Sequence, residues 1–237
     1  MRAEARTSMG IYNAKNHTKG FVRWGDLVRI LLLHFCNLLQ YICLIMNDLK
    51  IRTAIKEIEF RAHFEEIDTK VIDEMGLNLG SSIIDIAVIN GSMMGYEIKS
   101  DHDTLRRLEK QIIEYNKVFD FLNIVTSKKY APVIKDYVPK WWGIIEVEEK
   151  GNEVKVHQRR KAKLNKHISG YSLLQLLWKE ELSEIIDVYG LDKRVKNKPK
   201  KEIWTYISEM LALDVIKDTV RQYLKSRTSW KADLQLK

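Results

Sequence analysis

The stretch GYEIKSDHDTLRRLEKQIIEYNKVFD, from Gly95 to Asp120, carries the strongest indications of the fold. It begins as an apolar strand and continues as an amphipathic helix, whose apolar stripe comprises Leu105, Leu108, Ile112, Tyr115 and Phe119. Residues two apart in a strand share one face of the sheet. The sequence therefore predicts Glu97 and Lys99 side by side within a strand that is otherwise apolar.

Further strands are predicted on both sides of this stretch. They are Thr69–Met75, Ser81–Ile89, Phe121–Ser127, Trp141–Glu149 and Glu153–Arg159, the last two forming a hairpin around Gly151-Asn152. Because a helix separates the strand at Glu97 from Phe121–Ser127, these two strands are expected to be parallel within a mixed sheet. Long helices are predicted over Tyr171–Val188 and Lys200–Lys225.

The chain is expected to divide into three regions. Residues 1–45 form an N-terminal extension or accessory helix, residues 46–170 an α/β core, and residues 171–237 a helical C-terminal region, with Met46 as a candidate true start. Leu27–Met46 is long enough to span a bilayer, but its Arg29 and His34 are costly in hydrocarbon, so no membrane span is expected.

Composition narrows the setting and the class of partner. The formal charge of +8 and the pI of about 9.3 favour a polyanionic partner. The two cysteines, Cys36 and Cys43, are too few for a zinc site or a disulfide framework, so we expect a reducing, cytoplasmic location.

Two carboxylates are predicted at the centres of adjacent strands, Asp85 before the Asn90-Gly91 turn and Glu97 after it. Buried side by side they would repel each other unless a cation joined them. Mg²⁺ binds one or two carboxylates and keeps its waters for a substrate phosphate, while a nearby lysine such as Lys99 can orient or help to deprotonate an attacking water. The alternative is a strand edge with solvated charges and a Glu97–Lys99 surface pair.

The length of the turn decides whether Asp85 and Glu97 can share a site. A two-residue Asn90-Gly91 turn would put them on opposite faces. A shared site requires a three-residue loop with Gly91 in a left-handed conformation, or a bulge. The residues expected on the other face are then Ile84, Ile86, Val88, Met94, Tyr96 and Ile98.

The order Asp85, then Glu97-Ile98-Lys99, then a helix with Gln111-x-x-x-Tyr115 resembles the PD-(D/E)XK nuclease superfamily, in particular its RecB-type Gln-x-x-x-Tyr branch. The Glu-Ile-Lys-Ser-Asp-x-Asp-Thr run that begins at Glu97 is also similar to a group of bacterial nuclease-like proteins. The resemblance covers residues from about Met46 to Val188.

This resemblance implies a restriction-endonuclease-like αβββαβ core and hydrolysis of DNA phosphodiester bonds with Mg²⁺ or Mn²⁺. It implies that Asp85, Glu97 and the backbone carbonyl of Ile98 hold the metal and that Lys99 is the catalytic lysine. The superfamily often adds an upstream acidic residue, for which Glu74 is the first choice. The alternatives are Glu57, Glu59, Glu65 and Glu66.

Supporting roles are also implied. Gln111 and Tyr115 are expected to brace the site or touch DNA, although Tyr115 also fits ordinary core packing. Asp103 either lies in a hydrogen-bonded row beside the metal or favours the first turn of the helix. The candidate phosphate contacts, which could equally be a solvated surface, are Arg159, Arg160, Lys161 and Lys163.

DNA is therefore the expected partner, with RNA left open and no protein partner indicated. The alternative function is a catalytically silent nucleic-acid-binding module of the same fold. A membrane-tethered interaction protein rests only on Leu27–Met46.

Overall fold

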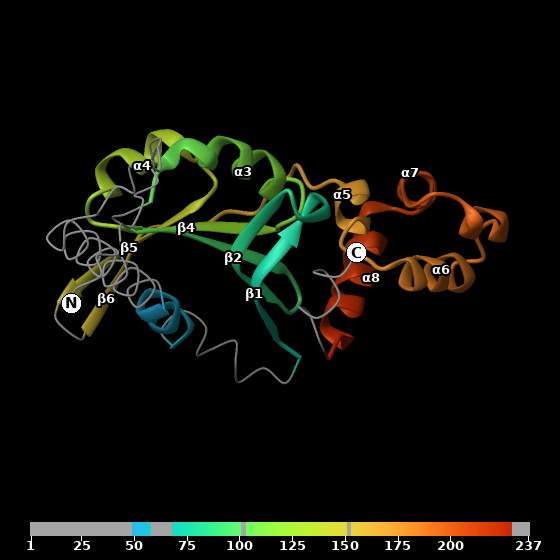
Figure 1. Ribbon diagram of the computed structural model, residues 1–237, viewed down its shortest axis with the longest axis horizontal. Coiled ribbons are helices and arrows are strands. Elements are labelled where there is room, and N and C mark those ends of the chain that lie inside the picture. Colours follow the sequence, from blue (N-terminus) through green and yellow to red (C-terminus); the bar gives the residue numbers. More distant parts are fainter. Residues whose placement is uncertain (1–48, 58–67, 101–102, 151–152, 229–237) are drawn as a thin grey trace, which may run out of the picture. The chain divides into compact units, whose positions relative to one another are not determined.

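The computed structural model describes residues 49–57, 68–100, 103–150 and 153–228 (Figure 1). The chain divides into two compact units, Met1–Cys43 and Leu44–Lys237, and all the described residues belong to the second. Leu27–Met46 lies outside the described residues. Within the described ranges, no helix combines the length and the apolar character needed to cross a bilayer.

In this part of the chain, six strands form one sheet in sequence order. They are β1 (Lys70–Leu77), β2 (Ser82–Ile89), β3 (Met93–Lys99), β4 (Phe121–Ser127), β5 (Gly143–Lys150) and β6 (Glu153–Arg160). The pairs β1–β2, β2–β3 and β5–β6 are antiparallel, whereas β3–β4 and β4–β5 are parallel. The predicted mixed sheet is confirmed.

Helices make the two parallel crossovers. The apolar stripe after Ser100 forms a short 3₁₀ turn, η2 (Leu105–Arg107), followed by α3 (Leu108–Tyr115), which leads into β4. A second helix, α4 (Ala131–Tyr137), leads into β5 and was not among the predicted elements. Pro132 in its first turn is the signal that could have revealed it, because proline fits the start of a helix.

The sheet separates two apolar cores. The larger core contains buried residues of α3, α4 and the C-terminal helices. The smaller core lies on the other face and contains Ile51 and Ile55, from the helical residues 49–57, against Val88 and Tyr96 of the sheet. Figure 1 shows α3 and α4 on one side of the sheet. Both faces are therefore covered, which explains why the central strands are almost continuously apolar.

The C-terminal region is helical, but the two predicted long helices are wrong because each is broken into two. The observed helices are α5 (Gly170–Leu174), α6 (Lys179–Val188), α7 (Lys200–Met210) and α8 (Leu213–Ser226), with a 3₁₀ turn η3 (Lys193–Asn197) between α6 and α7. At 100° per residue, the buried stripe of α8 would fall roughly opposite that of α7 if the helix continued. For α5 and α6 the two buried stripes would stand about a quarter turn apart. A break in each lets both stripes face the core.

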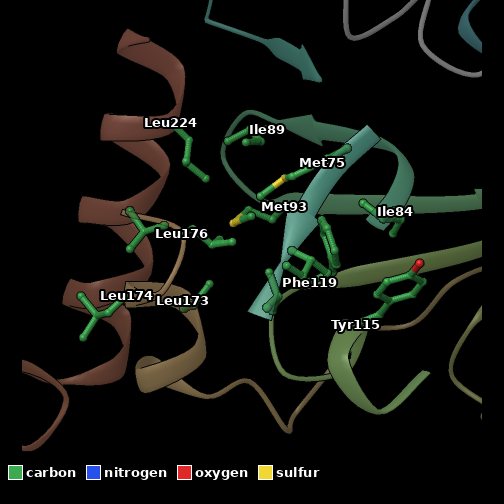
Figure 2. Packing of buried hydrophobic residues seen from close by; sticks show 14 of the residues in the cluster. Met75, Ile84, Ile89, Met93, Tyr115, Phe119, Leu173, Leu174, Leu176 and Leu224 are labelled. Carbon is green, nitrogen blue, oxygen red and sulfur yellow. The ribbon is translucent and has the colours of Figure 1, made fainter. Parts of the chain in front are cut away.

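The C-terminal helices share the larger core with the sheet. Figure 2 shows Ile89 and Met93 of the sheet near Leu176, which follows α5, and near Leu224, which lies in α8. A buried carboxylate, Asp120, reinforces this contact: it accepts a hydrogen bond from the Met93 amide at 2.8 Å and pairs with Lys217 of α8 at 2.6 Å. Packing of the helices and anchoring of β3 are therefore linked.

Candidate functional site

The loop between β2 and β3 has the predicted length. Ile89 pairs with Met93, so three residues, Asn90 to Ser92, connect the strands. The prediction that Gly91 is left-handed is wrong, because it has no positive φ. Instead, the Asn90 side chain accepts a hydrogen bond from the Ser92 amide at 3.0 Å and closes the loop locally. Counting back along this register, Asp85 stands opposite Glu97.

Ile84 and Ile86 were both expected on the face of β2 opposite Asp85. The structure confirms a common face for the residues after Asp85 but not for Ile84, which precedes it. Ile86 belongs to the smaller core as predicted, but Ile84 packs in the larger core with Met75. The reason lies in β1, where Glu74 has φ 52° and bends the strand opposite Asp85. Both strands therefore exchange their faces at the level of Glu74 and Asp85.

Asp85 lies at this point of exchange, and its carboxylate bonds to two different elements. Oδ2 accepts a hydrogen bond from the backbone amide of Ile98 in β3 at 2.7 Å. Oδ1 lies 2.6 Å from Nη2 of Arg52, whose Nη1 also donates to the Asp85 backbone oxygen at 2.9 Å. The regular pairing of β2 with β3 ends at Ile86 and Tyr96, and the hydrogen bond from the Ile98 amide to the Asp85 side chain continues the connection between the two strands.

Glu97 and Lys99 form a buried ion pair, which confirms that they share a face. Lys99 Nζ lies 2.6 Å from Glu97 Oε1, and only 2% of Glu97 and 7% of Lys99 are exposed. A solvated surface pair, the alternative left open by the sequence, does not describe these two residues. Strand β3 lies between β2 and β4, with Lys99 beside Thr126 of β4, and Gln111 and Tyr115 of α3 contact the pair.

Helix α3 supplies the remaining partners of Glu97. Gln111 Nε2 donates to Glu97 Oε1 at 2.9 Å and to the Tyr115 hydroxyl at 3.0 Å. The Tyr115 hydroxyl lies 2.8 Å from Glu97 Oε2 and 2.5 Å from the carbonyl oxygen of Ile83. Because Gln111 and Tyr115 are one turn apart, they face the strand together.

The hydroxyl of Tyr115 is affected by the charges of both carboxylates, Glu97 and Asp85. Burial raises the pKa of its hydroxyl far above the usual range, and the negative charges of Glu97 and Asp85 raise it further. Tyr115 is also fully buried in the larger core, stacked on Trp142 with ring centroids 6.3 Å apart. It is therefore both a core residue and a partner of the site, the two alternatives that the sequence left open.

The carboxylate oxygens of Asp85 and Glu97 are of the type that binds a hard divalent cation. However, the guanidinium of Arg52 and the ammonium of Lys99 already contact them. Carboxylate and carbonyl oxygens are the ligands that Mg²⁺ prefers. Here every carboxylate oxygen of Asp85 and Glu97 has a protein donor, and Arg52 and Lys99 bring two positive charges to the two negative ones. Among the described residues, no three His, Cys, Asp or Glu side chains stand close enough to hold a metal together.

The other acidic candidates take different positions. Glu74 is exposed and lies across β1 from Asp85, so the register places Glu74, Asp85 and Glu97 in one row across three strands. Glu57 is exposed on the helical residues 49–57. The alternatives at 59, 65 and 66 lie outside the described residues.

Asp103 closes the turn that follows β3. Its Oδ2 accepts hydrogen bonds from the amide and hydroxyl of Ser100, both at 2.8 Å, and its carbonyl oxygen accepts one from Tyr130. The residue at the N-cap of the following 3₁₀ turn is Thr104, not Asp103, and the Thr104 side chain makes no capping hydrogen bond. Asp103 therefore shapes the backbone at the end of β3, beside Lys99.

The four basic candidates divide into two pairs. Arg159 forms two 3.0 Å hydrogen bonds with Glu146, which lower the pKa of that carboxyl, and Arg160 donates to the carbonyl oxygens of Trp142 and Pro139. Both side chains are engaged in the fold. Lys161 and Lys163 are exposed and make no ion pair with any described residue. Their ammonium groups are the ones available to a phosphate.

Arg52 is the site residue that sequence reasoning missed. A basic residue on an amphipathic helix ordinarily indicates a solvated face, and nothing local distinguishes Arg52 from Lys56 one turn later. Lys56 pairs with Asp73 of β1 at 2.6 Å, whereas Arg52 reaches the centre of β2. The signal in the sequence was the four-residue spacing of Arg52 and Lys56, whose partners Asp85 and Asp73 lie on the neighbouring strands β2 and β1.

Comparison with known proteins places this chain in a family. It is 27% identical to protein cII of Enterobacteria phage P4 over 160 residues, which are 68% of this chain and 60% of that protein, so the chain spans less than two thirds of its relative. Among solved structures, Pyrococcus furiosus SfsA in complex with Ca²⁺ matches with a TM-score of 0.31 and 17% identity, over 49% of this chain and 64% of that one. That likeness is too low to support a common fold. The model of the bacteriophage P4 protein cII family matches residues 46–236, nearly all of the second compact unit, and the chain therefore belongs to that family.

Proposed function

We propose that this protein is a metal-dependent nuclease that hydrolyses DNA phosphodiester bonds, with its active site at Asp85, Glu97 and Lys99. One observation carries the proposal: a single hydrogen-bonded network joins Glu97 and Lys99 of β3 to Gln111 and Tyr115 of α3. The same residues carry the resemblance to the PD-(D/E)XK superfamily. Buried ionisable groups that converge in this way are typical of functional sites.

The topology supports the same proposal. A helix, three antiparallel strands, a crossover helix and a parallel fourth strand follow one another as 49–57, β1, β2, β3, α3 and β4. This order supports the proposal of a restriction-endonuclease-like αβββαβ core. In such a core the paired acidic residues lie on β2 and β3, where Asp85 and Glu97 stand opposite each other.

Each residue of the proposed site has a role that its contacts permit. Asp85, Glu97 and the carbonyl of Ile98 would hold Mg²⁺ or Mn²⁺, which when bound would polarise the phosphate and lower the pKa of a water molecule. Lys99, placed 2.6 Å from Glu97, would orient that water and assist its deprotonation. Gln111 and Tyr115 keep the Glu97 carboxylate in position, because each occupies a different oxygen.

Contacts to the substrate would come from the exposed lysines. Lys161 and Lys163 follow the edge strand β6 and are unpaired with other described residues. Neutralising phosphates in this way makes binding depend strongly on salt and only weakly on sequence. DNA is the proposed substrate, and RNA is the alternative of the same chemistry.

A second candidate function is favoured by a specific observation. All four carboxylate oxygens of Asp85 and Glu97 are already bonded within the protein, and the two acids are neutralised by Arg52 and Lys99. A site closed in this manner would suit a nucleic-acid-binding module that keeps the fold without cleavage.

A cleavage assay distinguishes the two candidates. Purified protein is incubated with single-stranded DNA, duplex DNA and RNA in Mg²⁺, Mn²⁺ or EDTA. We expect metal-dependent cleavage that Asp85→Asn abolishes and that Lys99→Ala lowers by about 10²–10⁴-fold, the usual contribution of a positioned acid or base. Asp73→Asn is the matched control, because Asp73 also pairs with a cation from residues 49–57 but lies on β1 and is half-exposed.

The binding measurement completes the test. Each variant is titrated against fluorescent DNA at several salt concentrations, and all should retain salt-dependent binding. Binding without cleavage of any substrate by the wild type would establish the module instead. Equal loss of activity in Asp73→Asn and Asp85→Asn would show that the effect is not specific to the proposed site.

A further inference from the structure

Arg52 makes an unusual contact for a residue on a covering helix. Residues 49–57 pack on the smaller core through Ile51 and Ile55, both fully or almost fully buried. This packing fixes the helix over β2 and directs Arg52 into the sheet. Its guanidinium donates both to the carboxylate and to the backbone oxygen of Asp85, and its side chain is only 15% exposed.

The contact competes with the use proposed for Asp85. The guanidinium lies 2.6 Å from Oδ1, which leaves no space for a metal ion and its waters at that oxygen. The other oxygen is held at 2.7 Å by the Ile98 amide. A carboxylate with both oxygens occupied can bind a metal only after one donor has moved, and Arg52 has a flexible side chain whereas the amide is part of β3.

We propose that Arg52 holds the place of the metal at Asp85, so that metal binding requires the guanidinium to leave and Arg52 sets the metal concentration at which the site fills. This inference rests on the proposed function, because it concerns the same metal. It makes Arg52 a positioning residue that acts through Asp85. In the metal-free protein it compensates the charge of Asp85, and in the metal-bound protein it is displaced.

The charges around Asp85 support an exchange of cations. Asp85 and Glu97 together carry two negative charges, and Arg52 and Lys99 together carry two positive ones. A divalent ion that displaced Arg52 alone would bring two charges in place of one. Its attraction to both carboxylates would therefore exceed that of the guanidinium to one, while release of Arg52 toward solvent avoids a stranded buried charge.

The test is isothermal titration calorimetry of the full chain with Mn²⁺. Arg52→Gln removes the competing cation, so we expect Mn²⁺ to bind about tenfold or more tightly than to the wild type, the effect of losing one partly buried ion pair. Lys56→Gln is the matched control: it removes the same charge from the same helix, but its partner is Asp73. We expect it to leave Mn²⁺ affinity nearly unchanged.

A thermal melt gives a second readout that does not depend on activity. Without metal, Arg52→Gln should melt below the wild type, because Asp85 loses its counter-ion. With saturating Mn²⁺ its midpoint should rise further than that of the wild type, since a tighter ligand stabilises more. Arg52→Lys, which keeps the charge but cannot make both contacts, should fall between the two in Mn²⁺ affinity and serves if Arg52→Gln does not fold.

The outcomes separate this inference from the proposed function. If the wild type binds Mn²⁺ and cleaves DNA but folded Arg52→Gln binds Mn²⁺ no more tightly, the inference fails and the function stands. Equal tightening by Lys56→Gln would also overturn the inference, because the effect would then be one of net charge. If neither the wild type nor Arg52→Gln binds Mn²⁺, the proposed metal centre fails and the inference fails with it.

Discussion

The buried pair of Glu97 and Lys99 predicts a large coupling energy that can be measured without any assumption about activity. The perturbation is a double-mutant cycle with Glu97→Gln, Lys99→Met and the double variant. Lys99→Met strands a carboxylate that is 2% exposed and retains only Gln111 and Tyr115 as partners. Breaking a buried ion pair by removing one partner typically costs 3–5 kcal/mol, and the two remaining donors place this variant near the lower end, at about 3 kcal/mol.

The double variant should lose much less stability than the two single losses combined. With both charges removed, an amide and a thioether of similar volume replace the pair, and such replacements are often nearly neutral. We therefore expect a coupling energy of about 2–3 kcal/mol. The assay is urea denaturation in EDTA, with circular dichroism as the probe, so that no bound metal contributes to the stability.

The result that would refute this reasoning is additivity. A coupling energy within about 0.5 kcal/mol of zero would show that the two residues do not interact in solution. An exposed pair would give only about 0–1 kcal/mol, so the experiment also decides between a buried pair and the solvated pair that the sequence left open.

Three further predictions follow from single features. Tyr115 should stay protonated in the native protein well above pH 10, because burial and two carboxylates raise its pKa. At alkaline pH, Tyr115→Phe should therefore leave the tyrosinate absorbance of the native protein unchanged. The same variant should lower the tyrosinate absorbance of the denatured protein by the contribution of one tyrosine. Since a raised native pKa favours the protonated form, this group contributes stability below pH 10 that is lost above it, and a smaller loss above pH 10 in Tyr115→Phe would be seen in urea melts. Gly95→Ala should destabilise the protein by about 1–3 kcal/mol, because the added carbon would stand 2.4 Å from a side-chain carbon of Ile84; an unchanged melting midpoint would contradict this packing. Replacing Lys161 and Lys163 by glutamine should weaken DNA binding and reduce the dependence of its logarithm on log salt by about 1 per lost phosphate contact, and an unchanged slope would exclude them as contacts.

The strands and the first crossover, through α3, could be predicted from the sequence because they depend on local and periodic signals. The β-branched run of β2, the stripe of α3 and the short turn at Asn90 determine which residues pair, and the strands begin and end within a few residues of the predictions. The long C-terminal helices could not be divided in this way. Their sequences are continuously helix-compatible, and the breaks before α6 and α8 depend on where each apolar stripe finds its core.

The sequence by itself determined the identity and spacing of Asp85, Glu97, Lys99, Gln111 and Tyr115, and the alternation rule was sufficient to place Glu97 beside Lys99. Only the tertiary structure decided what each carboxylate binds. Arg52 is 33 residues from Asp85 in the chain, and its approach depends on Ile51 and Ile55 finding the far face of the sheet. The exchange of faces at Asp85 likewise depends on the positive φ of Glu74 in another strand. Such contacts arise from packing between distant segments, which leaves no period or motif within either of them.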